Sequence, residues 1–257
     1  MLIVDADVHI SPVKEKGYIS AEEAIRRMDR AGVERALCWL QPPYIRETDK
    51  ANKYVFQATR RWPKRIIGFG WANPRLGVEH ARDTVKKCIE EYGFAGVKLN
   101  GAQDDYVIDD PELAMPVVEA VVAAGKVLAF HTGADAPENT HPFRVAKIAA
   151  AFPETKILMV HMGGVGWRNL TRSAVEVALE HPNLFLIGSA VRSYPILNAI
   201  EALGPKRLCF GSDTPFEPMY VEVARYKALL SDLAQPAQEQ IFGRNILHIL
   251  GLEGGQE

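Results

Sequence analysis

Short apolar runs rich in β-branched residues alternate with helical patterns along the whole chain. Strands are expected at about residues 2–9, 34–40, 65–71, 94–100, 126–131, 156–161, 183–188 and 207–213. Helices are expected at about 20–31, 47–62, 77–92, 111–124, 141–151, 168–180, 195–203 and 219–230, with a last one at about 235–250. Eight successive βα units predict one α/β domain over residues 1–257, a (β/α)₈ TIM barrel with an extra C-terminal helix.

An open, doubly wound α/β sheet is the alternative fold. That fold carries a glycine-rich phosphate-binding turn after its first strand, and this chain has no such turn there. No serine- or glycine-rich linker divides the sequence either. The barrel is therefore favoured. In a barrel the carboxyl ends of all strands meet at one mouth, where residues far apart in sequence can form a site.

The first predicted strand contains Asp5-Ala6-Asp7-Val8-His9. Because side chains alternate along a strand, Asp5, Asp7 and His9 are expected on one face and the apolar residues on the other. Burying two carboxylates and an imidazole together is costly unless a cation or a dense hydrogen-bond network compensates them. A divalent metal ion is the simplest compensation.

Three more side chains of the kinds that bind metals end later apolar runs. They are His131, His161 and Asp213. Each lies at the carboxyl end of a predicted strand, which is the end that faces the mouth of a barrel. Together with the first strand they predict an active site at that mouth.

Five short motifs accompany the first strand in the order and spacing of a known family. They are Gly96-Val-Lys-Leu99, His131-Thr-Gly133, His161-Met-Gly-Gly164, Gly211-Ser-Asp213-Thr-Pro215 and the C-terminal Gly243-Arg-Asn245-Ile-Leu-His-Ile-Leu-Gly251. Over essentially its whole length the chain resembles the amidohydrolase-2 family of the metal-dependent amidohydrolase superfamily. This branch includes aminocarboxymuconate-semialdehyde decarboxylase, resorcylate-type decarboxylases and pyrone-dicarboxylate lactonase.

The resemblance implies one divalent metal ion, with Zn²⁺ as the first choice and Mn²⁺ as the second. Its implied ligands are Asp7, His9, His131 and Asp213, and its implied catalytic residues are His161 and Asp213. Many members have His-x-His in the first strand, whereas here Asp7 takes the first position. The harder carboxylate oxygen shifts the preference away from metals that favour nitrogen ligands. His161 itself fits a ligand, an acid/base or a hydrogen-bonded neighbour, and acid/base is favoured because histidine titrates near neutral pH.

Basic side chains near the mouth are the candidates for binding substrate. Lys98 falls near the end of the fourth strand, where an unpaired cation is costly. A salt bridge to Asp5 or Asp7, or a bond to a substrate carboxylate, is the preferred interpretation. A carboxylated lysine that bridges two metals is the alternative. Four further candidates lie in predicted loops at the mouth: Arg46, Arg75, Arg192 and His141. The arginines can clamp an anion, and the histidine can contact substrate or begin a helix.

The site predicts a hydrolase that attacks a small carboxylated lactone, amide or ring with metal-activated water. Non-oxidative decarboxylation of a small aromatic or unsaturated acid on the same site is the first alternative, and a catalytically idle metal-binding scaffold is the second. Hydrolysis is preferred because nearly all of the 257 residues are used by the barrel, which leaves few for insertions over its mouth.

Composition excludes several other classes of function. The formal net charge is −2, so no basic surplus is available for nucleic acid or anionic lipid. No run of 18 apolar residues and no signal-peptide pattern occurs. The 3 cysteines are widely spaced, which is typical of reduced thiols in the cytoplasm. We therefore expect a cytoplasmic enzyme with a small-molecule substrate, and a homodimer is possible.

Overall fold

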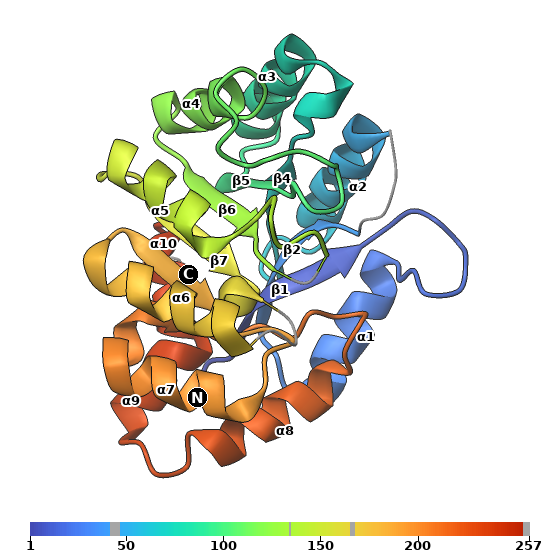
Figure 1. The fold of residues 1–257 in the computed structure, drawn as a ribbon. Coiled ribbons are helices and arrows are strands. Elements are labelled where there is room, and N and C mark those ends of the chain that lie inside the picture. Colours follow the sequence, from blue (N-terminus) through green and yellow to red (C-terminus); the bar gives the residue numbers. More distant parts are fainter. Residues whose placement is uncertain (42–46, 134, 165–167, 254–257) are drawn as a thin grey trace.

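The computed structural model describes residues 1–41, 47–133, 135–164 and 168–253. Parallel strands form a central ring, and helices surround it (Figure 1). The strands are β1 (Val4–Ile10), β2 (Arg35–Leu40), β3 (Ile66–Gly68), β4 (Gly70–Trp71), β5 (Gly96–Leu99), β6 (Val127–His131), β7 (Ile157–Val160), β8 (Leu184–Ile187) and β9 (Leu208–Cys209).

The strands pair in two runs, β1-β2-β3 and β4-β5-β6-β7-β8-β9. Strands β3 and β4 are two parts of one predicted strand, interrupted at Phe69, whose amide still donates to Cys38 O on β2. At the other junction, Ala6 N donates to Phe210 O (3.0 Å) and His9 N donates to Thr214 O (2.8 Å). Eight strand positions thus close into a ring, and the predicted barrel is confirmed.

The long helices cover the outside of the ring and lie close to their expected positions. They are α1 (Ala21–Ala31), α2 (Thr48–Arg61), α3 (Val78–Lys86), α4 (Met115–Ala123), α5 (Pro142–Ala151), α6 (Arg168–Glu180), α7 (Ser193–Leu203) and α8 (Met219–Leu229). Single π or 3₁₀ turns, η1 (Pro74–Leu76), η2 (Lys87–Glu91), η3 (His161–Gly163) and η4 (Pro205–Arg207), lie between them. The predicted C-terminal helix is divided into α9 (Gln235–Glu239), η5 (Gln240–Arg244) and α10 (Asn245–Ile249).

Apolar side chains form two main layers. One lies between the strands and the outer helices, and the other fills the ring. The inner layer includes Val4, Leu37 and Leu158 from the strands together with Ile246 and Ile249 from α10. The C-terminal helix therefore closes the bottom of the barrel, and burial of its apolar side chains holds it there.

Strand β1 breaks the expected alternation of its side chains. Its register with β2 shifts between Asp5 and Val8, which marks a bulge. As a result Ala6 packs inside the ring, whereas Val8 packs under the outer helices. The expectation that Asp5 shares a face with Asp7 and His9 is therefore wrong. A one-residue irregularity moves every later side chain to the opposite face.

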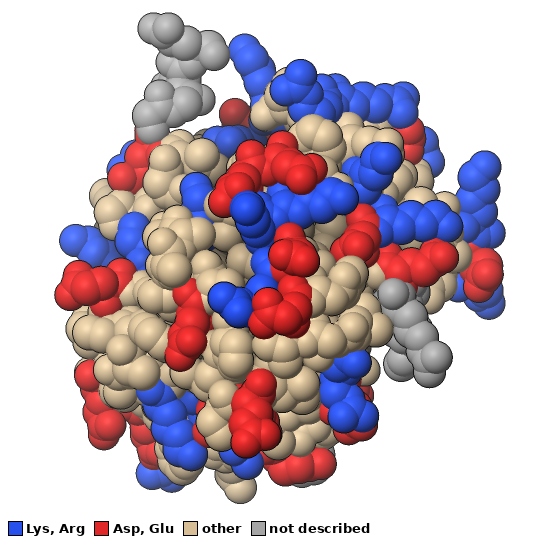
Figure 2. Space-filling model, turned by 90° about the horizontal axis from the view of Figure 1, so that it is seen from above, with Lys and Arg blue, Asp and Glu red and all other residues tan. Residues whose placement is uncertain are grey.

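Charged groups are mixed over the surface. Figure 2 shows Lys and Arg interspersed with Asp and Glu over the face it presents, in keeping with the formal net charge of −2. Among the described residues, no helix combines the length and the apolar content needed to cross a membrane.

Two nearby glycines give a test of the packing. A Cβ on Gly96 would lie 2.1 Å from Val127 O and 2.5 Å from the Phe69 ring, and a main-chain oxygen in a sheet cannot move away. We expect Gly96→Ala to lower the free energy of unfolding by about 3 kcal/mol. Gly93 has a φ of 67° but open space around it, so Gly93→Ala should cost only about 1 kcal/mol. Urea denaturation measures both, and equal losses would contradict the packing argument.

Candidate metal centre and active site

Three of the predicted ligands form one cluster. Asp7, His9 and Asp213 each offer a ligand atom, and these atoms all lie within 4.8 Å of one another. Asp7 and His9 are buried on β1, and Asp213 lies in the segment after β9 that closes the ring. The same main-chain contacts that complete the barrel therefore assemble the cluster.

The backbone is strained at two of the predicted catalytic residues. Asp213 has a φ of 59° and His161 a φ of 64°, in the left-handed region that side-chain-bearing residues rarely adopt. Such conformations persist where the surrounding structure holds them, and they concentrate at functional sites. Here they occur where the chain leaves a strand position and a ligand-type side chain is presented at the mouth.

Trp39 holds the first two ligands in place. Its Nε1–H lies 3.1 Å from Asp7 Oδ1 and 3.1 Å from His9 Nε2. On the other side of the imidazole, His9 Nδ1 lies 2.8 Å from Leu40 O, a carbonyl that can only accept, so Nδ1 carries the hydrogen. Nε2 then faces the carboxylates, 3.3 Å from Asp7 Oδ1 and 3.6 Å from Asp213 Oδ1, and it is the nitrogen that would bind a metal ion after losing its proton. Sequence analysis missed Trp39 because a tryptophan in a strand is typical of an ordinary core.

Opposite charges stabilise the ionised form of Asp7. Burial by itself would raise the pKa of this carboxyl group. The charge of Lys98, the hydrogen bond and charge of His9 and the charge of His161 outweigh burial and hold the pKa below its ordinary value. Asp5 behaves differently, because burial raises its pKa to about 7. Asp5 Oδ1 accepts from the amides of Asp7 (3.1 Å) and Ser212 (2.9 Å), which places this side chain in the closure of the ring.

His131 lies next to the cluster without belonging to its 4.8 Å group. Its ring packs edge-on against His161, with centroids 4.8 Å apart. Burial, followed by the neighbouring charges of His161 and Lys98, lowers the pKa of His131 well below its ordinary value. Its Nε2 is buried and has no hydrogen-bond partner among the described residues. A neutral imidazole with an unused nitrogen is suited to a metal, so the residues present fit a divalent ion.

His161 is held by Ser189, which sequence analysis did not single out. His161 Nδ1 lies 3.1 Å from Ser189 O and 3.0 Å from Ser189 Oγ. Ser189 Oγ also donates to Asp7 Oδ2 at 2.5 Å. The predicted acid/base is thus connected to the predicted ligand Asp7 through one buried hydroxyl group.

Lys98 lies fully buried on β5 beside this cluster. Among the described residues its Nζ has no hydrogen-bond partner, so the expected direct salt bridge to Asp5 or Asp7 is wrong. The ammonium instead lies 3.7 Å from the centre of the Trp39 ring and 5.3 Å from that of Trp71. Burial lowers the pKa of Lys98 to about 8, and the charges of Asp7 and Asp213 oppose that shift. Aromatic faces attract a cation but leave its hydrogen-bond donors free.

The other predicted substrate-binding residues are more peripheral. Arg75 is half-exposed and lies 3.7 Å from the exposed Asp105. Arg192 is exposed at the start of α7. His141 begins α5, where its Nδ1 accepts from Phe143 N at 3.2 Å. Arg46 lies outside the described residues.

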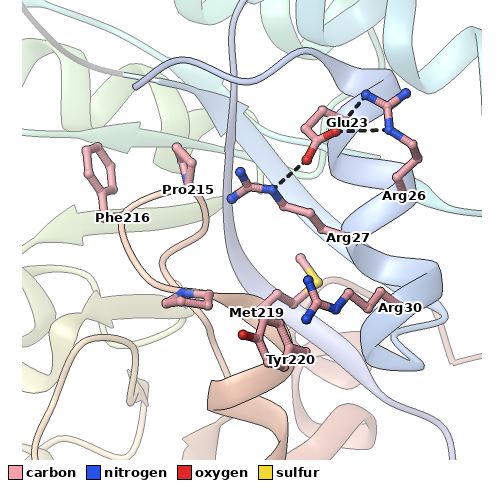
Figure 3. Close-up of a pocket in the computed structure, with 9 residues that line it drawn as sticks. Glu23, Arg26, Arg27, Arg30, Pro215, Phe216, Met219 and Tyr220 are labelled. Atoms are coloured by element: carbon pink, nitrogen blue, oxygen red, sulfur yellow. Dashed lines mark hydrogen bonds and ion pairs between the residues drawn. The ribbon is translucent and has the colours of Figure 1, made fainter. Parts of the chain in front are cut away.

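A groove of about 560 Å³ runs beside the mouth, between α1 and the segment 215–220 (Figure 3). Figure 3 shows the side chains of α1 facing this segment, with Arg27 pointing across the groove. Phe216 lines the groove and also packs edge-on against His9, with ring centroids 5.6 Å apart. The groove therefore adjoins the metal-ligand cluster through Phe216.

Comparison with known proteins places the chain in a family. The family model Amidohydro_2, described as amidohydrolase, matches residues 4–252. The chain belongs to this amidohydrolase family, and it shares the family's TIM-barrel architecture. The resemblance seen in the sequence motifs is confirmed.

Two curated relatives are decarboxylases. The chain is 23% identical to 2-amino-3-carboxymuconate-6-semialdehyde decarboxylase of Dictyostelium discoideum, over 79% of this chain and 66% of that protein, just under two thirds of its length. It is 24% identical to gamma-resorcylate decarboxylase of Polaromonas sp. (strain JS666 / ATCC BAA-500), over 76% of this chain and 77% of the relative. The expectation of a hydrolase is therefore wrong, since the relatives support its decarboxylase alternative. The small number of residues left for insertions over the mouth follows from the length of the chain. It does not decide which bond of the substrate breaks.

A solved structure shows the same fold with a metal bound. Dihydroxybenzoic acid decarboxylase from Polaromonas sp. JS666, with bound manganese and the inhibitor 2-nitroresorcinol, superposes with a TM-score of 0.76 at 18% identity. The match covers 98% of this chain and 97% of that one. The expectation of Zn²⁺ as the preferred metal is not confirmed by this comparison.

Asp104 gives a test of the electrostatics at the mouth. It accepts from Trp71 Nε1 at 3.0 Å, and burial raises its pKa from 3.8 to about 6. The ionised form is therefore destabilised in the folded protein, a cost that is present above pH 6 and disappears as the pH falls toward 4. Asp104→Asn should raise the free energy of unfolding at pH 8 by at most about 3 kcal/mol, and by almost nothing at pH 4.

The exposed neighbour supplies the control for this measurement. Asp105→Asn should change stability little at either pH, because its side chain is 86% exposed. Urea unfolding at the two pH values measures both variants. A gain for Asp104→Asn that is the same at pH 4 and pH 8 would contradict the assigned pKa.

Proposed function

We propose that the protein is a metal-dependent, non-oxidative decarboxylase of a small aromatic or unsaturated carboxylic acid. The observation that carries this proposal is the pairing, at one barrel mouth, of a carboxylate-rich ligand cluster with the buried ammonium of Lys98, which has no hydrogen-bond partner within the described part of the chain. A buried cation whose hydrogen-bond donors are unused is costly unless an anion binds to it. The decarboxylase activity of the two curated relatives supports the choice of reaction.

Asp7, His9, His131 and Asp213 would hold one divalent ion. When bound, this ion supplies positive charge that orients and neutralises oxygen atoms of the substrate. Mn²⁺ is supported by the manganese in the solved decarboxylase structure, and Zn²⁺ by the two histidine ligands.

The protein's own residues bind and orient the acid. Lys98 donates to an anionic oxygen of the substrate, a carboxylate or a phenolate. Trp39 and Trp71 face the same ammonium and offer planar surfaces to a ring. A small carboxylated ring thus matches both the charge and the aromatic walls.

His161 supplies the proton. Its Nδ1–H is directed to Ser189, so the imidazolium form of the ring gives up its Nε2 proton to the substrate and becomes neutral. The carbon that bears the carboxylate accepts this proton. The bond from that carbon to the carboxylate then breaks, its electron pair returns to the ring, and CO₂ leaves. His161 regains a proton from solvent, so each turnover consumes one proton.

Product analysis tests the reaction. We expect protein loaded with Mn²⁺ or Zn²⁺ to release CO₂ from at least one member of a panel of carboxylated phenols and unsaturated acids. Turnover in D₂O should place deuterium on the carbon that carried the carboxylate. His161→Ala should lower the rate by about 10² to 10⁴ and keep its metal, because a positioned acid contributes this much. Incorporation of ¹⁸O from labelled water without CO₂ release would contradict the proposal.

Elemental analysis tests the ligand set. Protein purified without chelators should contain about one divalent ion per chain, the number expected for a single site of three to four protein ligands. His131→Ala and Asp213→Ala should lose that ion, because the remaining carboxylate and imidazole groups no longer complete the site. His141→Ala is the control, since this histidine lies at the same end of the barrel but begins a helix. Wild-type metal content in both ligand variants would refute the assignment.

A further inference from the structure

We propose that the hydroxyl group of Ser189 is a positioning group that fixes the Asp7 carboxylate and the His161 ring relative to each other. The proposal deepens the proposed function, because it rests on Asp7 as a ligand and His161 as the acid. Ser189 follows β8 by two residues and is fully buried. It belongs to none of the motifs that the sequence singled out.

Counting donors and acceptors fixes the hydrogens of this network. The carboxylate of Asp7 can only accept, so the Ser189 hydroxyl hydrogen is directed to Asp7 Oδ2, 2.5 Å away. The hydroxyl oxygen then faces His161 Nδ1, 3.0 Å away, as an acceptor. Ser189 O, 3.1 Å from the same nitrogen, can only accept as well. Both contacts therefore require the hydrogen of the neutral His161 ring to be on Nδ1.

One tautomer of His161 follows from this arrangement. With Nδ1 engaged by Ser189, Nε2 is the nitrogen available to a substrate, and the ring cannot turn without losing two hydrogen bonds. The direct distance from His161 Nδ1 to Asp7 Oδ2 is 3.8 Å, too long for a hydrogen bond. Ser189 is thus the direct link between the two groups in the described structure.

Two glycines make room for this link. A Cβ on Gly188 would lie 2.1 Å from the hydroxyl oxygen of Tyr226, which donates to Gly188 O at 2.7 Å and so fixes the turn before Ser189. A Cβ on Gly211 would lie 3.1 Å from Asp7 Cβ and 3.2 Å from Ser189 Cβ. The missing side chain at Gly211 therefore leaves room for Ser189 and Asp7 to approach each other closely. A serine that only filled space in the core would not need this close approach.

The test uses Ser189→Ala in the full-length, Zn²⁺-loaded protein. Ser11→Ala is the matched control, since Ser11 is also buried just beyond a strand end, but among the described residues its hydroxyl accepts only from Val13 N. We expect Ser189→Ala to bind Zn²⁺ 10 to 100 times more weakly in competition with a chelator, because groups that orient a ligand contribute this much to affinity. Ser11→Ala should bind Zn²⁺ like the wild type.

A second measurement reports on His161 directly and needs no substrate. In ¹⁵N spectra of the Zn²⁺-loaded protein, the wild type should show His161 protonated at Nδ1, with this hydrogen protected from exchange. Ser189→Ala should exchange it at least 10 times faster. Unchanged metal affinity and unchanged exchange in Ser189→Ala would overturn the proposal, and so would equal losses in Ser11→Ala. Both readouts are independent of activity, so a failure of the decarboxylase assignment alone would leave them intact.

Discussion

The main-chain contacts between the first strand and the segment after the last one are the constraint on which the site depends. They close the ring through Ala6 and His9, and they bring Asp213 against Asp7. Closure therefore places two carboxylates and an imidazole together in a buried environment, which is unfavourable without compensation. The indole of Trp39, the ammonium of Lys98 and the proposed metal ion supply that compensation. The contacts that stabilise the closed ring are therefore the same contacts that assemble the site.

The interior of the barrel is divided along its axis. At the bottom, side chains of the strands pack with α10 in an apolar layer. At the mouth, the inward positions carry Lys98, Trp39, His131 and the metal-ligand cluster. The apolar layer excludes water from below, which strengthens every electrostatic interaction above it. In the proposed function, the buried ammonium would attract a small anionic substrate, and the aromatic faces would favour a planar ring.

The correction from hydrolysis to decarboxylation illustrates what a site of this kind determines. A divalent ion, an anion-binding cation and an acid/base histidine serve either reaction, because both need charge neutralisation and proton transfer. The difference lies in whether water or the substrate's own carbon receives the new bond. Residue types at strand ends carry no information on that choice, whereas the activity of the curated relatives bears on it.

The sequence by itself determined the order of strands and helices and the presence of ligand-type residues at strand ends, because hydrophobic periodicity and helix-ending residues are local signals. Tertiary structure decided which of those residues meet. The bulge in β1 turned Asp5 away from Asp7, and no local pattern marks a bulge. Ser189 and Trp39 became part of the site only through strand pairing, since a serine just after a strand and a tryptophan within one are ordinary residues. Lys98 was expected to pair with a carboxylate. Its partners proved to be aromatic rings, because the identity of a buried neighbour depends on packing between segments far apart in the chain.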